Sequence, residues 1–316
     1  MLVIGPPYST ANFDSLPDTF KIVDHLNGWD HNLHNDYLYL LDQHAQSQGR
    51  TFDIIYHQLL PDSATGQYKN LKIQFSSEFQ RMMNFRHFTR YNTHSELTFK
   101  NFVCSFNGSS HVSRRLLTSI LKKFNWFDPV YSSKNFYFTP DIIDGHLSDY
   151  LPDSQHQVYR NFFSNNDDFC QGIYSFGHNR YKHHQNIHTL ESKLTDSFLH
   201  VVSETMATSY CPFITEKFLY SIVTRGLFLS YAQPGWHDYL SKYYGFKKYT
   251  RLFDYRFDDI QNPVERLVEL MTMISKFSVL STDQWRDLYL LEADTIQYNY
   301  DWYFSKNYLK CLEQHE

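Results

Sequence analysis

The chain has 316 residues, which is enough for two ordinary domains or one large domain. Its formal net charge of −5 provides no basic field that would attract nucleic acid or an anionic membrane surface. No run of about 18 apolar residues occurs, and the start of the chain lacks the features of a secretory signal. We therefore expect a cytoplasmic protein with no membrane span and no nucleic-acid partner.

The four cysteines are widely spaced and form no Cys-x-x-Cys pair (Cys104, Cys170, Cys211, Cys311). Cys104 and Cys211 lie in or beside apolar segments, which is typical of reduced, structural thiols. Aromatic residues make up 18% of the chain. Filling of the core explains this content more simply than a carbohydrate-binding aromatic surface does.

The first hundred residues alternate between strand-like and helix-like segments. The predicted elements, in chain order, are a strand over Met1–Ile4, a helix over Asp36–Gln48, and strands over Phe52–Leu60 and Leu71–Phe75. Short links between such elements indicate an α/β domain.

A second α/β pattern begins at Asn101. It predicts a strand over Phe102–Phe106 and a helix over His111–Phe124. Residues 132–188 are polar, and we expect loops with one or two helices there. A strand ending near Val202 follows, then an amphipathic helix over Val264–Phe277. Residues 283–312 predict one or two further helices.

The segment from Ser203 to Gly235 is the most informative part of the chain. An apolar strand ends at Glu204, a loop follows, and Thr215-Glu216-Lys217 opens a helix that leads to a second apolar strand. Free backbone N–H groups at a helix start, with an adjacent Lys, favour an anionic phosphate-bearing ligand. The neighbouring acid suits a hydroxyl-rich group through charge-assisted hydrogen bonds. A nucleotide-sugar carries both groups.

Three segments together resemble the α1,3-fucosyltransferases and their bacterial and viral relatives. Phe102–Ile120 (FVCSFNGSSHVSRRLLTSI) resembles the strand-turn-helix that opens their donor domain, where the helix bears an Arg. Ser203–Pro234 resembles their central motif, in which a Phe-Glu-Asn strand end precedes a Tyr-Val-Thr-Glu-Lys helix start. Tyr244–Lys247 and Phe253–Asp258 resemble a later Gly-Phe-Lys and Phe-Asp-rich segment. The resemblance covers roughly residues 100 to 260.

This resemblance implies a GT-B fold, in which two Rossmann-like domains face a cleft. Residues 1–98 would form the N-terminal acceptor domain, and residues 99–282 the nucleotide-sugar donor domain. Residues 283–316 would be C-terminal helices that pack back on the N-terminal domain.

The activity implied is an inverting, metal-independent glycosyl transfer from a nucleotide-sugar to a glycan hydroxyl, with fucose from GDP-fucose as the favoured donor. No resident cofactor is required. Two alternatives stay open. One is a non-catalytic glycan-binding or assembly protein on the same fold, and the other is a different nucleotide-sugar enzyme, such as an epimerase.

The resemblance also assigns roles by position. Arg114 would contact the donor diphosphate, and Lys217 would neutralise its phosphates. Glu216 would bind ribose or sugar hydroxyls, with Glu204 beside it at the strand end. Phe213 stands where the family has an aromatic residue with a hydroxyl, so stacking is retained and one hydrogen bond is lost.

Each assignment competes with a plain structural role. Lys217 could be an ordinary solvated charge, but a Lys in the first turn opposes the helix dipole unless an anion is present. Arg114 and Arg115 lie on different faces of their helix, and Arg115 suits the exposed face. Glu216 is also a dipole-favoured residue at a helix start, and Glu204 needs a partner that is either ligand or protein.

An inverting transfer needs a base for the acceptor hydroxyl, which typically contributes about 10²–10⁴-fold. Glu78, just past the strand Leu71–Phe75, resembles the family's acid at that place. A surface Glu that caps the next helix is the equal alternative. His57 and Asp53 are lesser candidates.

Metal chemistry and several other enzyme classes lack their motifs. His178–His188 is rich in His but has no His-Glu-x-x-His or Cys partner, so it predicts a polar loop. The pairs Asp167-Asp168 and Asp258-Asp259 lack an Asp-x-Asp context, and we expect no metal site. Gly-x-Ser-x-Gly, Walker A and Gly-x-Gly-x-x-Gly do not occur, which disfavours hydrolase, P-loop and dehydrogenase functions.

Overall fold

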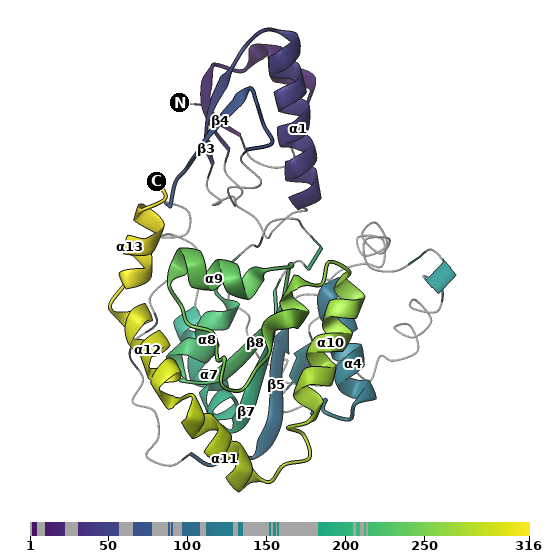
Figure 1. Cartoon of the computed structure of the whole chain (residues 1–316), viewed down its shortest axis with the longest axis vertical. Coiled ribbons are helices and arrows are strands. Elements are labelled where there is room, and N and C mark those ends of the chain that lie inside the picture. Colours follow the sequence, from purple (N-terminus) through teal and green to yellow (C-terminus); the bar gives the residue numbers. More distant parts are fainter. Residues whose placement is uncertain are drawn as a thin grey trace.

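Two parallel four-stranded sheets organise the described part of the chain in the computed structural model (Figure 1). The first has the order β1-β2-β3-β4, with strands Leu2–Ile4, Thr19–Ile22, Phe52–Tyr56 and Leu71–Phe75. The second has the order β6-β5-β7-β8, with β5 at Asn101–Asn107, β6 at Ser132–Lys134, β7 at Ser197–Ser203 and β8 at Leu227–Tyr231. Parallel strands linked by helices confirm the predicted α/β class.

The structure describes residues 2–4, 10–22, 31–56, 66–77, 88, 90, 97–107, 112–128, 132–134, 152, 154, 155, 157, 183–204, 207, 208, 212 and 214–316. The helices are η1 (Thr10–Ser15), α1 (His31–Ser47), α4 (Val112–Lys123), α7 (His183–Thr195), α8 (Lys217–Val223), α9 (Trp236–Tyr244), η4 (Tyr255–Asp259), α10 (Pro263–Ser275), α11 (Thr282–Leu291), α12 (Ala293–Phe304) and α13 (Asn307–Glu313). Within these ranges, no helix is both long and apolar enough to cross a bilayer.

The first sheet, η1 and α1 form the smaller lobe in Figure 1. Alternation along β3 buries Phe52, Ile54 and Tyr56 and leaves Asp53 exposed, as expected for a strand covered on one face. Leu38 and Leu41 of α1 pack into this core, three residues apart on one helical face.

The second sheet is the centre of the larger lobe, which holds helices α4 to α13 (Figure 1). Every residue of β8 is buried, because helices cover both faces of a central parallel strand. Figure 1 shows α4 and α10 on one side of the sheet and α7, α8 and α9 on the other. The strand order reverses between β5 and β7, which is a topological switch point.

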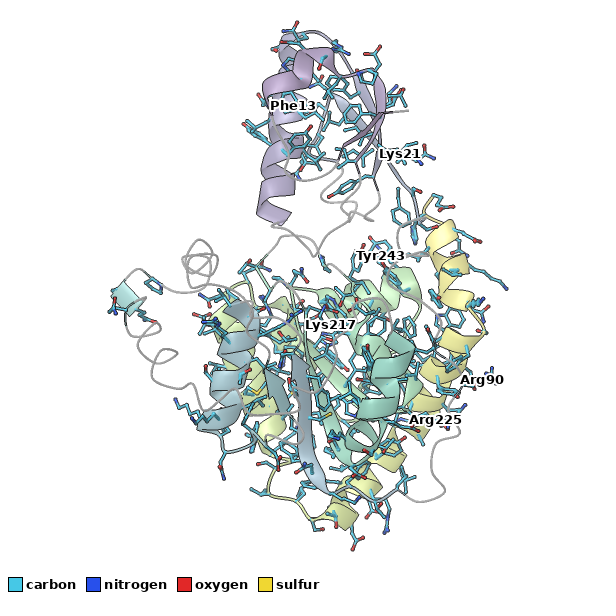
Figure 2. The ribbon with its side chains drawn as sticks, turned by 180° about the vertical axis from the view of Figure 1, so that it is seen from behind. Phe13, Lys21, Arg90, Lys217, Arg225 and Tyr243 are labelled. Atoms are coloured by element: carbon cyan, nitrogen blue, oxygen red, sulfur yellow. The ribbon has the colours of Figure 1, made fainter. Side chains whose placement is uncertain are left out.

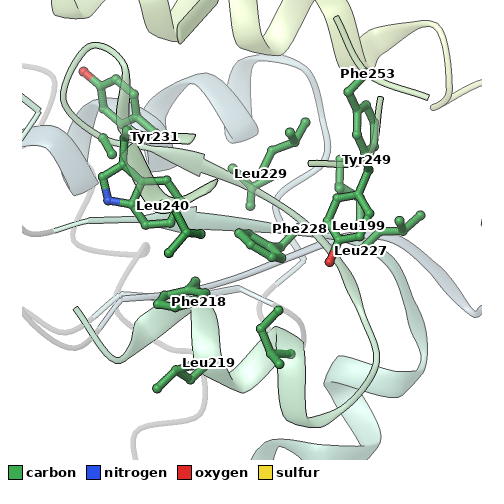
Figure 3. Close-up of a cluster of buried hydrophobic side chains, with 14 of the residues drawn as sticks. Leu199, Phe218, Leu219, Leu227, Phe228, Leu229, Tyr231, Leu240, Tyr249 and Phe253 are labelled. Atoms are coloured by element: carbon green, nitrogen blue, oxygen red, sulfur yellow. The ribbon is translucent and has the colours of Figure 1, made fainter. Parts of the chain in front are cut away.

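Aromatic packing fixes the helix that follows β7. Phe218 of α8 lies against Phe228 of β8 (Figure 3), with ring centroids 5.8 Å apart. It also lies edge-on to Trp236, with ring centroids 5.7 Å apart. Burying rings of this size stabilises each contact by about 2 kcal/mol or more. The start of α8 is therefore held by the core directly beneath it.

The C-terminal helices lie against the larger lobe and end beside the first sheet. Trp302 of α12 donates its indole N–H to the Tyr244 carbonyl at 2.8 Å. Beyond α13, the Glu316 carboxylate accepts from the backbone N–H of Ser77 at 2.9 Å and from the Ser77 hydroxyl. Figure 1 shows the chain end next to the end of β4. The carboxyl end of the first sheet is thus tied to the last residue.

The expected elements are largely confirmed, with three differences. Residues 283–312 contain three helices (α11, α12, α13) rather than one or two. His183–His188 begins helix α7, although the His-rich segment predicted a loop. Helix α9 and the short strands β2 and β6 were not predicted.

A buried histidine belongs to a central strand of the second sheet. His200 of β7 is 2% exposed; its Nε2 donates to the Leu194 carbonyl and its Nδ1 accepts from the Ser221 hydroxyl, both at 2.8 Å. Burial lowers the pKa of His200 from 6.5 to about 4. Gly226 passes so close that a Cβ there would lie 2.2 Å from Cε1 of His200.

We predict that His200 makes the protein lose stability in mild acid. The unfolded chain binds a proton at His200 near pH 6.5, whereas the folded chain does so only near pH 4. The full contribution is therefore present above pH 6.5 and falls by about 3 kcal/mol between pH 6.5 and 4. Urea denaturation should show a flatter pH dependence for His200→Gln. An unchanged slope in that variant would contradict the assignment.

We also predict that Gly226→Ala lowers the free energy of unfolding by about 3 kcal/mol, through collision with the His200 ring. The loss should shrink in a His200→Ala background, where the ring is gone. Gly49→Ala is the control, because Gly49 has φ 63° and nothing lies within 4 Å of the place where its Cβ would stand. Only about 1 kcal/mol of backbone strain is expected there. Equal losses at both glycines, measured by denaturation, would refute the steric explanation.

Candidate functional site

The predicted binding residues gather at the carboxyl ends of β5 and β7. In open parallel sheets, ligands bind outside the strand ends where the strand order reverses, and this is that point in the second sheet. Helix α4 follows β5, and Glu204 follows β7 directly. Figure 2 shows Lys217 at the side of the larger lobe that is turned toward the smaller lobe.

Glu204 is the centre of the cluster. It is completely buried, and its backbone N–H donates to the Tyr231 carbonyl at 3.0 Å, which extends the β7–β8 pairing by one step. Its Oε2 accepts from the Thr215 hydroxyl and lies 3.6 Å from the Lys217 ammonium. That ammonium also donates to Thr215 Oγ1 at 2.9 Å. Strand end, loop end and helix start are joined by one polar network.

Arg114 approaches the same network from the other side of the switch point. It lies on the first turn of α4 and is 3% exposed, whereas Arg115 is partly buried. Its positive charge acts on both Glu204 and Lys217. The neighbouring Ser113 hydroxyl donates to the Glu204 carbonyl at 3.5 Å. The structure thus brings Arg114 and Lys217 together from two separate helices.

Burial dominates the protonation of this cluster. It raises the pKa of Glu204 above its usual range, against the opposing effects of Lys217 and the Thr215 hydrogen bond. It lowers the pKa of Lys217, against the opposing effects of Glu216 and Glu204. Burial thus acts against ionisation of both side chains, whereas their mutual attraction acts in favour of the charged pair.

Glu216 immediately precedes α8 and makes no side-chain cap to it. Its charge raises the pKa of both Glu204 and Lys217, which places it electrostatically in the cluster. Helix α8 has only seven residues, so its dipole adds little. Because Glu204 supplies a counter-charge to Lys217, the position of Lys217 in a first turn is not in itself evidence for an external anion.

Arg266, which belongs to none of the sequence motifs, braces the surrounding loops. It is 1% exposed on α10, and its guanidinium donates to the carbonyls of Ala207, Ala232, Ile260 and Gln261. Its burial had a signal in the sequence, since Arg266 falls on the apolar stripe with Leu267 and Leu270, but its carbonyl partners had none.

Asp258 is held within the fold by hydrogen bonds to His237. It is buried, and its carboxylate accepts from the backbone N–H and from Nδ1 of His237, each at 2.8 Å. The Nε2 of His237 accepts from the Ser230 N–H at 3.0 Å. No group of three or more potential ligands surrounds a common metal position within the described ranges.

Several candidate residues lie outside the described residues: Glu78, Phe213, His57, Cys170, Cys211 and the pair Asp167-Asp168. Asp53 is described and is exposed on β3, where it lies 3.8 Å from the Lys72 ammonium. Cys104 is buried, and Cys104 and Cys311 are free thiols.

Comparison with known proteins gives no match, whether to a protein-family model, a curated protein or a solved structure.

We predict that Lys217→Met lowers the free energy of unfolding by about 3 kcal/mol, because it leaves the Glu204 carboxylate buried without its counter-ion. Losing Lys217 raises the pKa of Glu204 further. The deficit should therefore be largest at neutral pH and shrink as pH falls toward the ordinary carboxyl value of 4.5, where Glu204 is protonated.

Urea denaturation at about pH 7.5 and about pH 5.5 measures this difference. Lys72→Met is the matched control, because the exposed pair with Asp53 should contribute less than about 0.5 kcal/mol. A Lys217→Met deficit that is equally small, or independent of pH, would show that the pair does not carry buried charge.

Proposed function

We propose that this protein is a GT-B glycosyltransferase that moves a sugar from a nucleotide-sugar, with GDP-fucose as the favoured donor, to a glycan hydroxyl. Residues 1–98 would bind the acceptor, residues 99–282 the donor, and residues 283–316 would tie the two parts together. The transfer would be inverting and would need no metal.

The observation that carries the proposal is the convergence of Arg114 and Lys217 at the switch point, together with Glu204. A departing nucleoside diphosphate develops negative charge, which a guanidinium and an ammonium stabilise without a metal. Arg114 would form a forked contact to the diphosphate, and Lys217 would act as a point charge.

The arrangement of the two sheets supports the same proposal. Figure 1 shows β4 running toward the chain end beside the larger lobe, and the Ser77–Glu316 hydrogen bonds hold that end of β4 there. Lys217 lies at the side of the larger lobe turned toward the smaller lobe (Figure 2). The carboxyl ends of both sheets therefore face each other, as a donor and an acceptor in one reaction would require.

In this proposal Glu216 binds sugar or ribose hydroxyls, and Phe213 stacks on a ring of the donor. Glu78 is the proposed base, one residue after the anchored Ser77. It would remove the acceptor hydroxyl proton as that oxygen attacks the anomeric carbon and the nucleoside diphosphate leaves.

A non-catalytic glycan-binding protein on this fold is the second candidate. The observation in its favour is that Glu204 already balances the charge of Lys217. Such a protein would bind glycans and show no response to nucleotides.

We predict that GDP or GDP-fucose raises the melting temperature, whereas UDP- and CMP-linked sugars do so less. Ligand at a hundredfold excess over its dissociation constant should stabilise the fold by about 2.7 kcal/mol. Arg114→Gln and Lys217→Met should abolish the ligand-induced increment, whatever their own stability. Arg115→Gln is the control on the next helical position and should keep it.

Hydrolysis or transfer of the donor distinguishes an enzyme from the second candidate, and Glu78→Gln should remove turnover while nucleotide binding persists. A full nucleotide response in Arg114→Gln and Lys217→Met would refute the proposed site. Glycan binding without any nucleotide response would favour the non-catalytic protein.

A further inference from the structure

A second buried polar group lies beyond the end of the strand that neighbours β7. Gln233 follows β8 by two residues and has no exposed surface. Among the residues that the structure describes, neither its Oε1 nor its Nε2 has a hydrogen-bond partner, and the same is true of Oε1 of Glu204. Such groups are rare in folded proteins, because each buried polar atom left unsatisfied costs about 1–3 kcal/mol.

The backbone around Gln233 is firmly held. The carbonyl of Ala232 accepts from Arg266 at 2.9 Å, and the N–H of Gly235 donates to the Asp258 carbonyl at 2.7 Å. The carbonyl of Gln233 itself accepts from the Trp236 N–H at 3.3 Å. The backbone that carries the Gln233 side chain is therefore fixed, which is one requirement of a preorganised binding residue.

Gln233 and Glu204 lie just beyond the ends of two neighbouring strands, with Glu204 beside Ala232 and Gln233 one residue farther along. Ser203 pairs with Tyr231, and the Glu204 N–H donates to the Tyr231 carbonyl at 3.0 Å, so the two chain segments leave the sheet side by side. Adjacent strands lie about 4.8 Å apart. One carboxyl oxygen and one complete amide are thus offered at neighbouring strand ends.

We propose that Gln233 and Glu204 bind vicinal hydroxyl groups of the nucleotide-sugar; this inference rests on the proposed function. A hydroxyl both donates and accepts, so a pair of adjacent hydroxyls can satisfy the amide N–H, the amide oxygen and the available carboxyl oxygen together. Neither a phosphate, which only accepts, nor an apolar ring meets all three requirements. The hydroxyls belong to the ribose or to the transferred sugar.

The test is binding of GDP, 2′,3′-dideoxy-GDP and GDP-fucose to the wild type and to Gln233→Met, measured by calorimetry. If the ribose is bound, wild type binds GDP about tenfold more tightly than the dideoxy analogue, and Gln233→Met loses this difference. If the transferred sugar is bound, the advantage of GDP-fucose over GDP is lost instead. Gln297→Met, at an exposed position on α12, is the control and should change neither ratio.

The melting temperature without ligand gives an independent readout. Because the Gln233 amide has no hydrogen-bond partner in the described part of the chain, Gln233→Met and Gln233→Leu should be as stable as the wild type or more stable. A clear loss of stability in both variants would overturn the inference, since the amide would then have a structural role. Unchanged affinity ratios in Gln233→Met would also overturn it while the proposed function stands. Failure of the wild type to bind any nucleotide would overturn both.

Discussion

A carboxyl group with no exposed surface, placed where a central strand ends, is the constraint on which the rest of the site depends. Removing Glu204 from water is costly unless partners are supplied. These partners come from the residues at the start of α8. The Thr215 hydroxyl donates to the Glu204 carboxylate, and the Lys217 ammonium lies beside it. Helix α8 can then begin only where Lys217 reaches Glu204, and its Phe218 falls directly onto the core. One buried acid thereby fixes the register of the loop, the helix and the polar edge of the sheet.

Arg266 stabilises the same edge of the sheet in a different way, by hydrogen bonds to backbone carbonyls. It uses a buried charge to collect carbonyl oxygens from three chain segments, with no carboxylate among these bonds. Backbone carbonyls near a switch point would otherwise need water, because the strand pairing that satisfied them has ended. Arg266 and the His237–Asp258 pair satisfy so many polar groups around the edge that the amide of Gln233, without a partner among the described residues, is conspicuous. Arg266, His237 and Asp258 therefore stabilise the carboxyl edge of the second sheet, whereas the Gln233 amide is available to a ligand.

Elements with a strong apolar pattern were predictable from the sequence, and those held by tertiary contacts were not. In the strand Asn101–Asn107 and in helix α10, the pattern of apolar residues can be read directly from consecutive positions in the sequence. Strand β6 reads Ser-Ser-Lys and is a strand because β5 offers it a free edge. The cluster of Arg114 with Lys217 was predictable because both follow predicted strand ends of one parallel sheet. The role of Arg266 was not, because residues 207 and 266, far apart in sequence, meet only in the folded chain.

The balance of charge within the cluster limits what its ligand can be. With every group ionised, Arg114 and Lys217 offset Glu204 and Glu216, so no net attraction for a simple anion results. Burial shifts the pKa of Glu204 upward and that of Lys217 downward; an anion beside Lys217 favours its ammonium form, so a protonated Glu204 gives the cluster net positive charge when an anionic ligand keeps Lys217 charged. A ligand that carries a phosphate next to neutral hydroxyls would favour this state through two interactions. The phosphate would bind the Arg114 and Lys217 cations, and a hydroxyl would form a hydrogen bond with the protonated Glu204 carboxyl group. An ion such as free phosphate gains only the first of these contributions. The electrostatics therefore favour a mixed ligand, anionic at one end and polyhydroxylated at the other, over either part alone.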